Sequence, residues 1–74
     1  MYNEDNLKRQ LTNRTIEEIR QRGWSQNVAS LELEVPDSTI NYIMKRRLKR
    51  YSIKKLAEIL SKLGFEFEIK LTKI

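Results

Sequence analysis

The sequence contains no cysteine and no histidine. The lack of cysteine excludes a disulfide framework and a thiolate metal site. The lack of both residue types also removes most zinc sites and most nucleophile–base pairs used in catalysis. The carboxylates cluster mainly as glutamate pairs on predicted solvent faces, with no glycine-rich phosphate loop beside them. We therefore expect a protein that is not an enzyme, with no metal ion and no cofactor.

Long apolar runs are also missing. The longest uninterrupted ones span only a few residues, which is too short to cross a membrane. The opening MYNEDNLKRQ carries acids and no apolar stretch, so we expect no signal peptide. The expected location is cytoplasmic, with no membrane partner.

Charge is distributed unevenly along the chain. Residues 1–37 hold five Lys/Arg and seven Asp/Glu, a balance of −2, whereas residues 38–74 hold ten and three, a balance of +7; the two sum to the net charge of +5. Such an asymmetry favours a polyanionic partner, either nucleic acid or an acidic membrane surface. The alternative is that the basic residues only keep a small domain soluble.

A chain of 74 residues, 39% of them apolar, is predicted to form one domain (1–74) with a hydrophobic core. A domain this small buries only about 60% of its unfolded surface. Its stability is therefore marginal, and dimerisation would increase it.

The most informative stretch covers about 25–46 and predicts two short helices joined by a tight turn. On each helix the apolar positions fall on one face at helical spacing. They are Val28, Ala29 and Leu33 on the first helix and Ile40, Ile43 and Met44 on the second, with Val35 between the helices. We interpret the stretch as a helix-turn-helix whose recognition helix covers about 37–46.

Polar side chains, most of them small, occupy the outward face of the second helix, where they would enter a DNA major groove. They are Ser38, Thr39 and Asn41, followed by Tyr42. Asn41 is the best candidate for reading a base, because asparagine can make two hydrogen bonds to adenine, and Thr39 could contact a thymine methyl group. The alternative is that these are ordinary exposed helix positions.

Candidate phosphate contacts flank this face. The basic run consists of Lys45, Arg46, Arg47, Lys49 and Arg50. It would supply salt-dependent affinity for the DNA backbone. Ser25 is a good N-cap for the first helix, and together with Gln26 it forms a natural phosphate contact. The alternative for Ser25 is a plain cap without a role in binding.

Two further helices are predicted around this unit. The helix before it runs either from about 5 to 22 or only from about 13, and Gly23 ends it at a left-handed position. After the unit, Ser52 caps a helix over Ile53–Leu63 that ends at a glycine.

The periodicity changes from helical to alternating after residue 64. Across about 65–72 four apolar side chains alternate with charged or polar ones, as in a half-buried strand: Phe65, Phe67, Ile69 and Leu71. A lone strand leaves its backbone groups unpaired, so we predict that it pairs with a second copy in a homodimer. The alternatives are that it packs on its own helices or pairs with another protein. The predicted fold is mostly α, with four to five helices and this one C-terminal strand.

Several short motifs occur in a recognisable order. They are GWSQ at 23–26, Val28-Ala29, Leu33, Val35, Ile40, Leu48, Tyr51-Ser52, Leu56 and Leu63-Gly64. Together they resemble the Cro/repressor-type helix-turn-helix proteins of the XRE family, in particular the short antitoxin-like regulators with one C-terminal strand. The resemblance covers about residues 16–71.

The resemblance implies a dimeric, sequence-specific transcription regulator, a repressor, with double-stranded DNA as its partner. By resemblance, Gln26 touches a backbone phosphate, the groove side chains are Ser38, Thr39, Asn41 and Tyr42, and the flanking cations are Lys45, Arg46 and Arg47. Some similar proteins also neutralise a toxin enzyme. The alternative function is therefore an antitoxin-type module that binds a partner protein, through the strand or the basic run, and autoregulates.

Three positions depart from the family pattern. The tight turn often has Gly where this chain has Glu34, the recognition helix often opens Ser-Gln where this chain has Pro36-Asp37, and Arg46 replaces a frequent Gly after the helix. A left-handed conformation costs a non-glycine residue about 1 kcal/mol. Asp37 would repel phosphate, although it can accept a hydrogen bond from a cytosine amino group.

Overall fold

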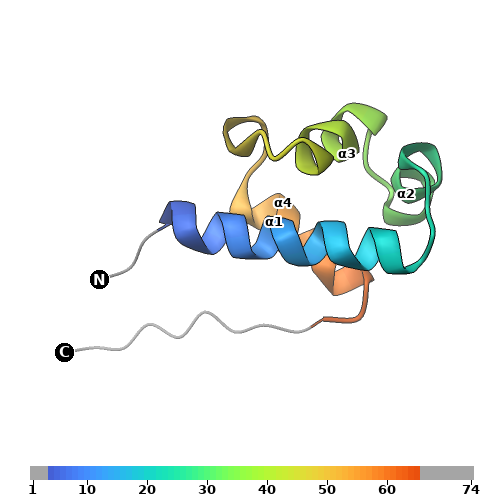
Figure 1. Cartoon of the computed structure of the whole chain (residues 1–74), viewed down its shortest axis with the longest axis horizontal. Helices are drawn as coiled ribbons and strands as arrows, with labels where there is room; N and C mark the ends of the chain where they lie inside the picture. Colours follow the sequence, from blue (N-terminus) through green and yellow to red (C-terminus); the bar gives the residue numbers. More distant parts are fainter. Residues whose placement is uncertain (1–3, 66–74) are drawn as a thin grey trace.

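The computed structural model describes residues 4–65 and shows four α-helices and one short 3₁₀ helix in that range. In chain order these are α1 (Glu4–Gln21), α2 (Gln26–Leu33), α3 (Asp37–Met44), the 3₁₀ helix η1 (Leu48–Arg50) and α4 (Ile53–Lys62). α1 packs against α4, α3 and η1, and α2 packs against α3. In Figure 1 the long α1 crosses the molecule, with α2, α3 and η1 above it. The mostly α fold is thereby confirmed.

The predicted C-terminal strand, about 65–72, lies almost entirely outside the described residues. Only Phe65, the first apolar residue of the predicted alternation, falls inside them. The strand therefore stays a prediction.

α1 is one continuous helix of 18 residues, which confirms the longer of the two predicted alternatives. Thr15 lies inside the helix and is buried. Its hydroxyl donates a hydrogen bond to the Leu11 carbonyl at 2.8 Å, so it is satisfied without breaking the helix. Gly23 follows α1 with a φ of 67°, the predicted left-handed stop. Neither α1 nor any other helix in residues 4–65 is long and apolar enough to cross a membrane.

Side-chain caps start α2 and α4, as predicted. The hydroxyl of Ser25 accepts a hydrogen bond from the Val28 N–H at 3.2 Å, and that of Ser52 accepts one from the Lys55 N–H at 3.0 Å. These bonds satisfy backbone donors that the first turn of a helix leaves unpaired. α4 ends one residue earlier than predicted, at Lys62.

The apolar face predicted for α2 is wrong at one position. The structure buries Ala29 and Leu33 but leaves Val28 39% exposed, and it also exposes 70% of Leu31. Val28 precedes Leu33 by five residues, which at 3.6 residues per turn rotates it about 140° away from the buried side. α2 therefore has an outward apolar pair, Val28 and Leu31, in addition to its core face.

The core forms where the inner faces of the four α-helices meet. Its buried apolar members are Ile16, Ile19, Ala29, Leu33, Ile40, Ile43, Tyr51, Leu56, Ile59, Leu60 and Leu63. Val35 packs against the edge of this core from its place between α2 and α3, as the sequence predicts. Helices as short as α2 and α3 are marginal in isolation, so this packing holds them.

The tight turn keeps a left-handed residue although it lacks glycine there. Glu34 has a φ of 57° and ends α2. The ammonium of Lys62 on α4 donates hydrogen bonds to the Leu33 carbonyl at 2.9 Å and to the Glu34 carboxylate at 3.1 Å. These two bonds fasten the turn to α4 and partly offset the cost of the left-handed conformation.

Glycine at this position tests the backbone cost directly. We expect Glu34→Gly to have a free energy of unfolding about 1 kcal/mol higher than Glu34→Ala, because glycine adopts positive φ without a Cβ clash. Both variants lose the carboxylate that faces Lys62, so their difference isolates the backbone. Urea denaturation measures it, and an alanine variant as stable as the glycine variant would contradict the prediction.

A buried hydrogen bond joins α1 to the segment that precedes α4. The hydroxyls of Thr12 and Tyr51 lie 2.9 Å apart, and both residues are buried. Burial raises the pKa of the Tyr51 phenol above its ordinary value, while the Thr12 hydrogen bond and the charge of Arg46 offset part of the rise. The phenol is therefore neutral at physiological pH and available as a hydrogen-bonding hydroxyl.

A double-mutant cycle checks this pair. We expect Tyr51→Phe to lower the free energy of unfolding by about 1–3 kcal/mol, because it leaves the Thr12 hydroxyl buried without its partner. Thr12→Val removes that hydroxyl, so the double variant should lose less than the sum of the two single losses. Additive losses in urea denaturation would show that the two hydroxyls are not energetically coupled.

Candidate nucleic-acid interface

α3 presents one buried and one open side. Ile40 and Ile43 are fully buried in the core. Pro36 occupies the N-cap position without a side-chain cap, which makes Asp37 the first helical residue. The helix ends at Met44, two residues before the predicted end, because the backbone turns left-handed at Arg46, with a φ of 56°.

The four predicted groove residues differ in exposure. Ser38 is exposed, whereas Thr39, Asn41 and Tyr42 are half-buried. The Tyr42 ring packs against the core, and the Arg50 guanidinium lies 5.8 Å from the ring centroid. The position of Arg50 is therefore fixed partly by a cation–π contact with α3.

A hydrogen bond connects the two predicted contact points of the motif. The Asn41 amide donates to the Gln26 side-chain carbonyl at 3.2 Å, which links the open side of α3 to the first residue of α2. Each amide keeps free capacity: Asn41 retains its carbonyl and one N–H, and Gln26 retains its amide nitrogen. Ser25 beside them is exposed and is engaged as the α2 cap.

The basic run lies where α3 ends and η1 follows. All five of its side chains are exposed: Lys45, Arg46, Arg47, Lys49 and Arg50. None of them forms an ion pair with a carboxylate among residues 4–65. The only side-chain hydrogen bond shown for the run goes from the Arg46 Nε to the Asn13 carbonyl at 3.0 Å. The run therefore projects positive potential that described carboxylates do not neutralise.

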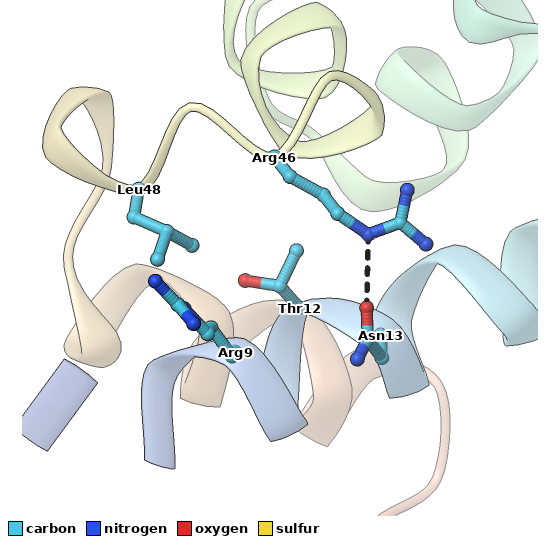
Figure 2. A pocket seen from close by; sticks show the side chains of 5 residues that line it. All are labelled: Arg9, Thr12, Asn13, Arg46 and Leu48. Carbon is cyan, nitrogen blue, oxygen red and sulfur yellow. Dashed lines mark hydrogen bonds between the residues drawn. The ribbon is translucent and has the colours of Figure 1, made fainter. Parts of the chain in front are cut away.

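A pocket next to this run brings in α1, which sequence reasoning did not include. It lies between α1 and the segment joining α3 to η1 (Figure 2), and its volume is about 330 Å³. Its lining residues are Arg9, Thr12, Asn13, Arg46 and Leu48. The four-residue spacing of Arg9 and Asn13 puts both on one side of α1. That spacing is the only sequence signal for the site, and it does not reveal the partner segment.

The predicted dimerisation residues are only partly described. Phe65 is half-buried and packs against the core, with the Arg14 guanidinium 5.0 Å from its ring centroid. Phe67, Ile69 and Leu71 lie outside the described residues.

Comparison with known proteins assigns the chain to a family. A family model described as a helix-turn-helix domain matches residues 2–72, almost the whole chain. No curated protein matches, and no solved structure matches. The matched range includes α2, the turn and α3 in full. The chain belongs to the helix-turn-helix domain family.

Proposed function

We propose that the protein is a sequence-specific DNA-binding transcription regulator that acts as a homodimeric repressor, with α3 in the major groove. The observation that carries the proposal is the position of the basic run in a helix-turn-helix domain. The run directly follows α3, and its cations form no ion pair with a carboxylate among residues 4–65. Cations in this position meet backbone phosphates when the helix enters the groove. The repressor role rests on the resemblance to Cro/repressor-type proteins.

Phosphate contacts on two sides would set the register of α3. Gln26 stands at the N-terminus of α2, where backbone N–H groups and the helix dipole favour an anion. The cations from Lys45 to Arg50 follow the C-terminal end of α3. A duplex held by phosphate contacts at both places would have little freedom to slide, so base-facing side chains would meet defined positions.

Asn41 is the proposed base reader. Its free carbonyl and second N–H match the two hydrogen-bonding groups that adenine shows in the major groove. The bond to Gln26 holds its side chain in one orientation, so reading a base costs less conformational entropy. A phosphate bound by Gln26 and a base bound by Asn41 would then form one hydrogen-bonded chain.

Selection from genomic DNA tests the proposal. Fragmented genomic DNA is incubated with the protein over a salt series, and the retained fragments are sequenced. We expect enrichment of a pseudo-palindrome with half-sites about one helical turn apart, as a two-fold dimer requires. Retention without sequence enrichment that disappears as salt rises would contradict a sequence-specific function.

Asn41→Ala tests base recognition separately from phosphate binding. We expect it to lower affinity for the selected site by about 1–3 kcal/mol while leaving affinity for unrelated DNA and the salt dependence unchanged. Arg47→Gln is the matched control: it should weaken all sequences similarly and reduce the slope of log K against log salt by about one. Electrophoretic mobility shifts over a salt series measure both variants.

The two variants also show how this assignment can fail. Equal loss on every sequence for Asn41→Ala would remove Asn41 as the reader. An unchanged salt slope for Arg47→Gln would place Arg47 away from the phosphates.

We propose that residues 65–72 form the strand that joins two copies. The proposal rests on the sequence alternation, since most of the segment lies outside the described residues. Sedimentation equilibrium at micromolar concentration should show a dimer for the natural chain. Phe67→Lys should give a monomer with the same helical circular dichroism, because a charge would stand on the paired apolar face. A natural chain that is monomeric at this concentration would contradict the proposal.

A protein-binding, antitoxin-type function is the second candidate. The outward apolar pair on α2 favours it, since Leu31 is 70% exposed on a side of the helix that makes no core contact. Toxin neutralisation and DNA binding can coexist in one chain. Non-specific DNA retention in the selection experiment, together with a protein that co-purifies with the natural chain and is lost with Leu31→Lys, would favour this candidate.

A further inference from the structure

The pocket between α1 and the α3–η1 segment joins Arg46 to residues of α1, Arg9 among them, that the proposed function does not use. It lies beneath the end of the recognition helix, and Figure 2 shows Arg9 near Leu48 at one end and Arg46 near Asn13 at the other. Its volume of about 330 Å³ is within the range of small-molecule sites.

The charges around the pocket are of one sign. Two guanidinium groups, from Arg9 and Arg46, contribute to its lining, and no carboxylate does. Within residues 4–65 the structure shows no side-chain hydrogen bond or ion pair for Arg9, and the Arg46 side chain donates only through its Nε. The terminal nitrogens of both guanidiniums are therefore available as donors. The Thr12 hydroxyl is already bonded to Tyr51.

We propose that this pocket holds a phosphate group, with Arg9 and Arg46 as its charged donors. Phosphate oxygens match the fork of an arginine, and ionised hydrogen bonds of this kind are the strong ones.

Occupation of the pocket would act on the recognition helix through Arg46. The Arg46 N–H donates to the Ile43 carbonyl at 3.0 Å, so the residue belongs to the end of α3 as well as to the pocket. Its left-handed backbone and its bond to Asn13 fix one arrangement of this end. A phosphate on its guanidinium would stabilise that arrangement further.

The phosphate can come from two sources. One is a backbone phosphate that flanks the groove, and this source rests on the proposed DNA-binding function. The other is a small phosphorylated molecule, which requires no DNA. The two arms of the experiment use different probes. One tests whether the pocket binds phosphate at all, and the other tests whether that phosphate comes from DNA.

The first arm uses inorganic pyrophosphate and no DNA. Titration followed by ¹⁵N–¹H correlation spectra should shift the amide signals of Asn13, Arg46 and Leu48. Arg9→Gln should weaken this binding about tenfold, as the loss of one charge-assisted contact predicts, and Arg9→Lys should restore part of it. Lys54→Gln is the charge control, because it removes one exposed cation of α4 that does not line the pocket.

The second arm measures the salt dependence of DNA binding. If a backbone phosphate enters the pocket, Arg9→Gln should reduce the slope of log K against log salt by about one on every sequence. Lys54→Gln should leave the slope closer to that of the natural chain. Circular dichroism confirms that the variants keep their helices, as expected for exposed side chains.

The outcomes are distinct. Pyrophosphate binding with an unchanged salt slope supports the site with a small molecule as the source, and a lowered slope supports it with DNA as the source. Neither effect, or equal effects of Arg9→Gln and Lys54→Gln, overturns the phosphate site. If the protein binds no DNA, the proposed function fails, and the pyrophosphate arm alone decides whether the site exists.

Discussion

The orientation of α3 depends on two left-handed residues, one on each side of it. Glu34 and Arg46 both have positive φ and neither is glycine. The side chain of each contacts the layer beneath: Glu34 pairs with Lys62 of α4, and Arg46 bonds to Asn13 of α1. Backbone conformations that sterics disfavour persist only where the surroundings over-determine them. Both ends of α3 are therefore anchored to the helices that form the base of the domain.

This anchoring allows a helix of only eight residues to carry two unlike surfaces. Its core side is held by Ile40 and Ile43, which are fully buried. Its other side keeps polar groups whose hydrogen-bonding capacity is not exhausted within the domain, as the bond between Asn41 and Gln26 illustrates. A short helix that is fixed by its ends and its core side can present such groups in a defined geometry, which recognition of base edges requires.

The basic run is placed at the edge of this anchored unit, from the end of α3 through η1, and all five of its side chains are exposed. Its cations stay solvated, so the absence of described carboxylate partners costs little stability. The same absence preserves their attraction for a polyanion. Arg46 belongs both to this run and to the pocket lined by α1. The positive charge of the run is therefore in contact with α1 through the Arg46 side chain.

The sequence by itself determined where the helices lie along the chain and that the surface after the second motif helix is positively charged. Caps at Ser25 and Ser52, a stop at Gly23 and apolar spacing located the helices, because these signals are local and depend only on neighbours within one or two turns. The tertiary structure decided which side of α2 faces outward, leaving Val28 exposed. It also decided that α1 meets the basic run. Asn13 and Arg46 are 33 residues apart in the chain, and their contact follows from how the helices pack around a shared core, which no local pattern encodes.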